Sequence, residues 1–280
     1  MSRPTVSQER RSELEHKVQK SKEIIREAFG KFDAKQLAVA WTGGKDSTTM
    51  LWIIRQVCLE DGFTQPRAMF IEEGDTFPEI MDFVSEVSKK WNVDLDVCMN
   101  KDVHDAAGGV LGAKVLVSKL NERNQREIRE RLKLDVESFP FEAESFIGNH
   151  LMKTVPMNIF IEKNSIKGIF QGLRWDEQPA RKQDEYFEFK EKEDLQPPHT
   201  RIRPILHFME RDIWDTIFTF GIPHVCLYEQ GYRSLGAKTT SVKLSNVPAW
   251  EQDLEHTSER AGRRQDKEKM MERMRKLGYM

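Results

Sequence analysis

A short apolar run, a pair of glycines and a helical pattern follow one another near the start of this chain. Residues 36–41 are typical of a buried strand, 42–47 have the sequence T-G-G-K-D-S, and 47–58 carry apolar residues at helical spacing. Glycine lets the backbone adopt positive φ and approach an anion closely. The free amides and the dipole of a helix start favour negative charge. This strand–turn–helix unit predicts a phosphate-binding loop and restricts the fold more than any other feature.

The side chains of the loop support the same prediction. Lys45 supplies a cation, and the hydroxyl groups of Thr42 and Ser47 supply hydrogen-bond donors. The loop matches neither the Walker pattern G-x-x-x-x-G-K-[ST] nor the Rossmann pattern G-x-G-x-x-G. The alternative is a plain glycine turn with a solvated lysine. The residues expected to hold a nucleotide are Thr42, Gly43, Gly44, Lys45, Asp46 and Ser47.

Strand and helix patterns alternate after this loop. Residues 68–71 and 93–99 predict two further strands, separated by a helix that begins near Pro78. Additional strands and helices are predicted at 166–171, 202–206, 144–164 and 210–220. This order is typical of an α/β fold with a parallel twisted sheet and helices on both faces.

The patterns divide the chain into three regions. We expect an N-terminal helical segment over 1–35, a nucleotide-binding α/β domain over 36–225 and a C-terminal extension over 226–280. An insertion near 104–141 interrupts the domain. Less regular segments are predicted as a mobile glycine loop at 108–112, an exposed charged helix at 117–134, a charged loop at 175–198 and a basic helical tail at 251–277.

Composition excludes several classes of protein. The net charge is only −2, so we do not expect a nucleic-acid partner. Cys58, Cys98 and Cys226 form no C-x-x-C pair, which argues against a zinc or iron–sulfur site and favours a reducing compartment. Residues 1–31 have no signal-peptide core, and no apolar run approaches the ~20 residues that span a bilayer. We therefore expect a cytoplasmic protein without a membrane partner.

The loop resembles the S-G-G-K-D-S loop of the ATP pyrophosphatase (PP-loop) superfamily. Within it, the chain is similar to the branch that contains phosphoadenosine-phosphosulfate (PAPS) reductases and the small subunit of sulfate adenylyltransferase. The resemblance implies an adenine nucleotide alpha-hydrolase-like fold. Four further segments support it: F-I-E-E-G-D-T-F-P-E at 70–79, G-L-R-W-D-E at 172–177, the run from R-P-I-L at 203–206 to I-P at 222–223, and G-Y-R-S-L-G at 231–236.

Two strings favour the adenylyltransferase. H-L-M-K-T at 150–154 and T-S-E-R-A-G-R at 257–263 are similar to segments of that family. The resemblance implies that the C-terminal extension closes over the site, and that the partner is a GTPase subunit or a second copy of the chain. The chain departs from the family pattern in three respects. Glu72 stands where the family has Asp, the insertion has no counterpart, and the stretch after Tyr228 is shorter.

The resemblance also implies roles for residues outside the loop. Glu72 and Gly172 are expected to contact the nucleotide, and Arg174 and Arg181 to hold an oxyanion such as sulfate. The two arginines are alternatively surface ion-pair partners of nearby acids. Mg²⁺ is expected to bridge the phosphates of ATP, with Asp46 as a candidate ligand. Lys45, Arg174 and Arg181 are thus the candidate catalytic residues, while Trp175 either stacks on the base or packs in the fold.

The cysteines separate two possible reactions. The reductases attack with a thiolate in a C-terminal E-C-G-x-H-like segment, and no cysteine follows Cys226, which we expect to be buried and inert. Adenylyl transfer needs no protein nucleophile. The hypothesis is that ATP and an oxyanion, sulfate above all, give an adenylylated product and pyrophosphate. The alternatives are a PAPS-reductase-like protein that binds a sulfonucleotide and a non-catalytic nucleotide-binding subunit.

Overall fold

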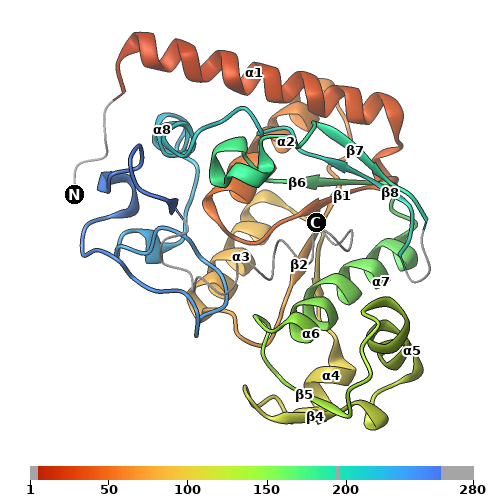
Figure 1. Ribbon diagram of the computed structural model, residues 1–280. Coiled ribbons are helices and arrows are strands. Elements are labelled where there is room, and N and C mark those ends of the chain that lie inside the picture. Colours follow the sequence, from red (N-terminus) through yellow and green to blue (C-terminus); the bar gives the residue numbers. More distant parts are fainter. Residues whose placement is uncertain (1–5, 193–195, 260–280) are drawn as a thin grey trace.

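The computed structural model describes residues 6–192 and 196–259, and a six-stranded sheet with the order β3-β2-β1-β6-β8-β7 lies at its centre (Figure 1). Five strands run parallel, and β7 at one edge is antiparallel to β8. The strands are β1 Leu37–Ala40, β2 Arg67–Ile71, β3 Leu95–Cys98, β6 Gly168–Gln171, β7 Phe187–Lys190 and β8 His199–Ile202. The predicted α/β fold with a mostly parallel sheet is confirmed.

Helices cover both faces of the sheet because its inner strands are apolar on both sides. In β1, Leu37 and Val39 pack into the main hydrophobic core, whereas Ala38 between them packs into a separate cluster on the opposite face. The main core lies under α1 Gln8–Lys31, α2 Lys45–Asp61, α3 Pro78–Trp91 and α8 Glu210–Phe220. The opposite face is covered by α7 Val155–Asn164, which contributes Phe160 and Ile161.

The insertion is a folded lobe and not a mobile loop. It comprises α4 Lys101–Ala106, β4 Lys114–Leu116, η2 Val117–Lys119, α5 Glu122–Arg126, η3 Glu127–Arg131, β5 Ser138–Pro140, α6 Phe146–Asn149 and η4 His150–Thr154. It lies at one end of the sheet (Figure 1). Buried Val103, Val115, Ile128, Phe139 and Leu151 form its own core. The prediction that the charged segment 117–134 is exposed is therefore wrong, because the apolar side of this segment is buried in the lobe.

Several other expectations differ from the structure. The loop expected at 175–198 contains β7, whose alternating sequence F-E-F-K suits an edge strand. The last parallel strand ends at Ile202, where we expected it to begin. Cys226, expected to be buried, is exposed. The extension forms η7 Cys226–Tyr228 and η8 Ala249–Glu251, and 252–258 is not helical; residues 260–277 of the predicted basic tail lie outside the described part of the chain.

Within the described residues, no helix is long and apolar enough to cross a membrane.

Candidate nucleotide-binding site

A cavity of about 350 Å³ opens at the carboxyl ends of the central parallel strands. Residues from the ends of β1, β2 and β6 line it, together with the glycine loop and parts of the C-terminal extension. Ligands in open α/β sheets bind at this edge, and the volume is within the range of small-molecule sites, about 300 to 1,000 Å³. The strand–turn–helix unit predicted from the sequence therefore lies where a nucleotide site is expected.

Glycine is required at two places in the wall of this cavity. Gly43 has φ +74°, and a Cβ there would lie 2.9 Å from methyl groups of Ile80 and Val84 on α3. A Cβ on Gly172, which follows β6, would lie 2.8 Å from the backbone of Ser47. Both positions allow a close approach of backbone segments that a side chain would prevent. The loop is consequently held between α3 on one side and the β6 loop on the other.

Hydrogen bonds within the loop fix its shape and leave amides available. The Thr42 amide donates to Ser47 Oγ over 3.2 Å, and the Lys45 amide donates to the Tyr228 hydroxyl over 3.0 Å. Burial raises the pKa of Tyr228 to about 12, so this hydroxyl stays neutral and can accept. The next two amides, of Asp46 and Ser47, have no acceptor in the first turn of α2. These amides are suited to binding an anion.

Lys45 is a buried cation with acidic neighbours. Its side chain is 1% exposed, and Nζ lies 2.5 Å from Glu259, 3.1 Å from Asp46 and 3.9 Å from Glu210. Burial alone would lower the pKa of Lys45, but these carboxylates raise it above the ordinary value. The alternative of a solvated lysine in a plain turn does not fit this arrangement.

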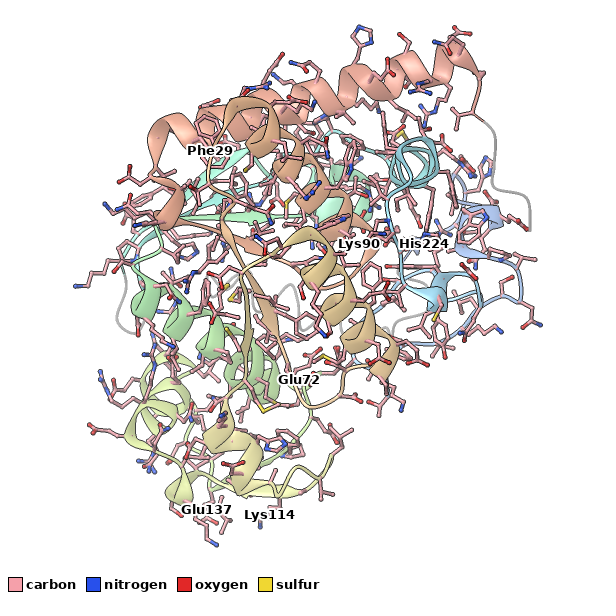
Figure 2. The ribbon with its side chains drawn as sticks, turned by 180° about the vertical axis from the view of Figure 1, so that it is seen from behind. Phe29, Glu72, Lys90, Lys114, Glu137 and His224 are labelled. Carbon is pink, nitrogen blue, oxygen red and sulfur yellow. The ribbon has the colours of Figure 1, made fainter. Side chains whose placement is uncertain are left out.

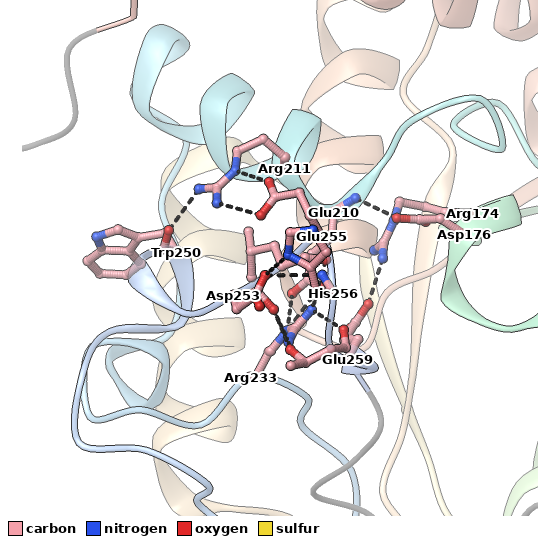
Figure 3. Close-up of polar contacts among 12 residues, drawn as sticks. Arg174, Asp176, Glu210, Arg211, Arg233, Trp250, Asp253, Glu255, His256 and Glu259 are labelled. Carbon is pink, nitrogen blue, oxygen red and sulfur yellow. Dashed lines mark hydrogen bonds and ion pairs between the residues drawn. The ribbon is translucent and has the colours of Figure 1, made fainter.

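Arg174 lies beside Lys45 and shares two of its partners. Its guanidinium donates to Asp46. It also donates to Asp176 over 2.8 Å and to Glu259 over 2.6 Å (Figure 3). Burial lowers the pKa of Arg174, and the acids more than offset that effect. The structure thus brings Lys45 and Arg174 together through shared acids, although Arg174 lines a neighbouring cavity and not this one. Arg174 also forms the ion pairs with nearby acids that the alternative interpretation predicted, but these pairs are buried and do not lie on the surface.

Arg181 is buried near this cluster but does not line the cavity. Its Nη1 lies 3.1 Å from Glu177, whose side chain does line it. Burial raises the pKa of Glu177 against the opposing effect of Arg181, and the carboxylates of Glu259 and Asp46 raise it further. Arg181 is therefore joined to the wall of the cavity by its ion pair with Glu177.

Glu72 and its neighbour Glu73 point to different partners. One carboxylate oxygen of Glu72 accepts from the Gly74 amide over 2.7 Å and from Thr76 over 3.1 Å. Glu72 lies between the sheet and the lobe (Figure 2), and the cavity is lined by Glu73 instead. Glu73 pairs with Lys153 over 2.8 Å. The role predicted for Glu72 in nucleotide contact remains a prediction, while Glu73 and Lys153 are in direct reach of the cavity.

Tyr228, Glu259 and Lys153 are among the lining residues that the sequence did not predict. Tyr228 and Glu259 come from the C-terminal extension, and Lys153 comes from the lobe. The strings H-L-M-K-T and T-S-E-R had marked the segments of Lys153 and Glu259, but not these side chains. His150, from the first string, is instead buried in the lobe 2.7 Å from Glu127. Trp175 packs against Tyr186 with ring centroids 5.5 Å apart and does not line the cavity.

Among the described residues, no group of three or more His, Cys, Asp or Glu side chains is arranged to hold a metal ion. Asp46, the candidate ligand of Mg²⁺, accepts hydrogen bonds from Lys45 and Arg174. Its hard oxygen donors suit Mg²⁺, but one carboxylate does not make an all-protein site. The residues therefore fit an ion that reaches the site with the phosphates of a nucleotide.

The loop, its buried cations and its place at the sheet edge define an α/β protein of the PP-loop class. The chain belongs to the phosphoadenosine phosphosulfate reductase domain family, whose model matches residues 36–243. Both the fold class and the suspected family are thereby confirmed.

Individual relatives are distant and differ in their named activities. A probable FAD synthase of Caenorhabditis elegans is 24% identical over 84% of this chain and 36% of its own length. Sulfate adenylyltransferase subunit 2 of Aeromonas salmonicida is 24% identical over 81% of this chain and 69% of its own. FMN adenylyltransferase of Candida glabrata has a TM-score of 0.62 at 18% identity, covering 94% of this chain and 91% of that one. The chain thus spans about a third of the first relative.

Proposed function

We propose that this chain transfers the adenylyl group of ATP to an oxyanion acceptor, with sulfate as the acceptor and pyrophosphate as the second product. The observation that carries the proposal is the meeting of two buried cations, Lys45 and Arg174, at the glycine loop that lines the cavity. Relatives named as adenylyltransferases support it. A Candida glabrata FMN adenylyltransferase solved with ATP has a TM-score of 0.57 at 20% identity, over 86% of this chain and 66% of that one.

The residues present suit an in-line displacement at the α-phosphorus. An oxygen of the acceptor forms a bond to that phosphorus, and the bond to the bridging oxygen of the β-phosphate breaks. Lys45 and the amides of Asp46 and Ser47 would stabilise the charge of the departing pyrophosphate. Arg174 would hold the acceptor, with Arg181 supporting it through Glu177. Mg²⁺ would supply further charge neutralisation between phosphate oxygens, with Asp46 beside them.

The thiols favour transfer over thiol-based reduction. Burial, with nearby Asp61 and Asp96 respectively, raises the pKa of Cys58 and of Cys98 to about 11. A thiol with such a pKa is protonated near pH 7 and is a poor nucleophile. None of the three cysteines is among the residues that line the cavity. A sulfonucleotide-binding role would therefore need a thiol from another molecule.

A second acceptor, the phosphate of FMN, is favoured by a neighbouring cavity. This space of about 330 Å³ shares Glu177 and Glu259 with the first cavity and has Arg174 in its wall. It is larger than sulfate needs and adjoins the two cations. The relatives named FAD synthase and FMN adenylyltransferase agree with this alternative.

The partner also remains part of the proposal. The relative named as subunit 2 of sulfate adenylyltransferase supports assembly with a second subunit, for which a GTPase or another copy of this chain is expected. A non-catalytic nucleotide-binding subunit is the remaining alternative, and it predicts binding of ATP without turnover.

The test is release of pyrophosphate from Mg²⁺–ATP by the purified chain with no acceptor, with sulfate and with FMN, and identification of the adenylylated product. We expect release that depends on sulfate and disappears in Lys45→Ala. Formation of FAD with FMN but no product with sulfate would select the second acceptor. Binding of ATP without release under any of these conditions would contradict catalysis by this chain alone.

A further inference from the structure

The carboxylate of Glu259 occupies the position between the two buried cations. One oxygen lies 2.5 Å from Lys45 Nζ. The other accepts from Arg174 Nη2 over 2.6 Å (Figure 3). Glu259 is 9% exposed and comes from the C-terminal extension, 214 residues beyond Lys45. A carboxylate held by an ammonium and a guanidinium has the same contacts that a phosphate group would make there.

The charges of this cluster leave little attraction for another anion. Lys45 and Arg174 hold the pKa of Glu259 far below its usual range, although burial opposes them, so the side chain is ionised. Asp46 contacts both cations as well. Each cation therefore already has at least two carboxylate partners. A phosphate can gain the full interaction with them only if one carboxylate leaves.

Of the two shared carboxylates, Glu259 is the one placed to leave. Asp46 lies in the first turn of α2, directly after the glycine loop, so the helix fixes its backbone. Glu259 follows η8 through residues 252–258, which form no helix or strand. Arg233 holds this stretch in place, because its guanidinium donates to the carbonyl groups of Asp253 and Thr257. Release of Glu259 would break its two ion pairs and leave those anchors in place.

We propose that Glu259 and a phosphate group of the ligand exchange on Lys45 and Arg174, so that Glu259 sets the affinity of the site for pyrophosphate and for nucleotides. The inference rests on the proposed phosphate-binding role of the glycine loop and goes beyond it. In the unliganded chain the carboxylate keeps the buried cations paired. After transfer, its return competes with pyrophosphate and favours release of that product.

The first experiment measures binding of inorganic pyrophosphate with Mg²⁺ by calorimetry. Glu259→Gln keeps the size of the side chain and removes its charge, and Glu251→Gln makes the same change at an exposed position of the same segment. A competitor that occupies the site most of the time raises the apparent Kd by the inverse of the open fraction. We expect Glu259→Gln to lower the Kd about tenfold and Glu251→Gln to leave it unchanged.

The second experiment needs no variant. Amide hydrogen exchange at 258–259 should become faster in the wild-type chain at saturating pyrophosphate, because displacement of Glu259 frees that part of the segment, whereas 249–257 stays held by Arg233. A structural role alone predicts the opposite results, namely weaker binding by Glu259→Gln and unchanged or slower exchange, and either result would overturn the proposal. Neither measurement needs an acceptor, so failure of adenylyl transfer would not affect them.

Discussion

The guanidinium of Arg174 donates in three directions, to Asp46, Asp176 and Glu259, while its side chain is 1% exposed. A planar fork can serve three acids at once, whereas an ammonium is a single point of charge on a flexible stem. Lys45 is that single point in this cluster. The two cations are consequently not interchangeable, and the arginine determines how the acids around the loop are oriented.

Substitution of this arginine tests the difference. Arg174→Lys keeps the positive charge but loses the planar fork that reaches Asp46, Asp176 and Glu259 in fixed directions, so we expect kcat/KM for pyrophosphate release to fall roughly 10²-fold. Arg211→Lys is the control, since Arg211 is partly exposed and pairs with Glu255 away from Lys45. Steady-state kinetics with a thermal unfolding curve for each variant separate loss of activity from loss of folded protein. An Arg174→Lys enzyme with unchanged kcat/KM would contradict the role assigned to the fork.

The glycine loop has a fixed shape because α3 and the loop after β6 pack against it from two sides. Ile80 and Val84 close one side at Gly43, and Gly172 closes the other side at Ser47. The glycine loop, α3 and the loop after β6 therefore meet in the cavity wall. The direction of the α2 amides depends on this packing as well as on the loop itself. A change in this junction should affect both stability and binding.

Two glycines with nearly the same φ allow a matched comparison. Gly62→Ala, at φ +73° with no atom within 4 Å of the new Cβ, carries only the cost of a left-handed conformation, about 1 kcal/mol. Gly43→Ala, at φ +74°, adds contacts of 2.9 Å with Ile80 and Val84, which should cost roughly 1–3 kcal/mol more. Urea unfolding gives the two values, and we expect only Gly43→Ala to weaken ATP binding. Equal losses of stability would show that the junction relaxes freely.

At the scale of the whole molecule, the lobe and the C-terminal extension each supply cavity-lining residues that the sheet does not provide. The lobe brings Lys153 to the cavity and carries Phe141 under Gly74, while the extension brings Tyr228 and Glu259. The extension is also joined to the loop after β2, because the Lys238 amide donates to the carbonyl of Asp75 over 2.7 Å. The site is thus complete only when three distant parts of the chain are folded together.

The buried pair of His150 and Glu127 in the lobe makes global stability depend on pH. Burial lowers the pKa of His150 below 6.5, although Glu127 opposes the effect. The unfolded chain therefore binds a proton before the folded chain does. Stability from this group is fully present above pH 6.5 and is lost as the pH falls toward the folded-state pKa, with a slope of at most about 1.4 kcal/mol per pH unit.

Unfolding by urea at pH 7.5 and pH 5.5 tests this dependence. His150→Gln should be less stable at pH 7.5 but lose less stability on acidification than the wild type. His256→Gln, at an exposed side chain, is the matched control. Burial also lowers the pKa of His199 and His207, so part of the acid loss should persist in His150→Gln. An identical slope in His150→Gln and the wild type would refute this assignment.

Local patterns were sufficient for the parallel strands β1, β2, β3 and β6, the glycine loop and the position of Lys45, but they misplaced β8. Each depends on neighbours in sequence: an alternating or continuous apolar run, two glycines and a helix start. The same patterns missed β7 because charged residues on an edge strand resemble a loop. They also missed the buried side of the charged segment in the lobe, since burial there comes from contacts with Leu151 and Phe139.

The sequence by itself determined the class of fold, the family and the glycine loop that lines the cavity, because these follow from short-range periodicity and from motifs of adjacent residues. Only the tertiary structure decided which carboxylates meet the loop. Glu259 reaches Lys45 across 214 positions, and Glu73 lines the cavity where Glu72 had been expected. The physical reason is that the charge balance of a buried site depends on the paths of distant segments, which neighbouring residues in sequence do not specify.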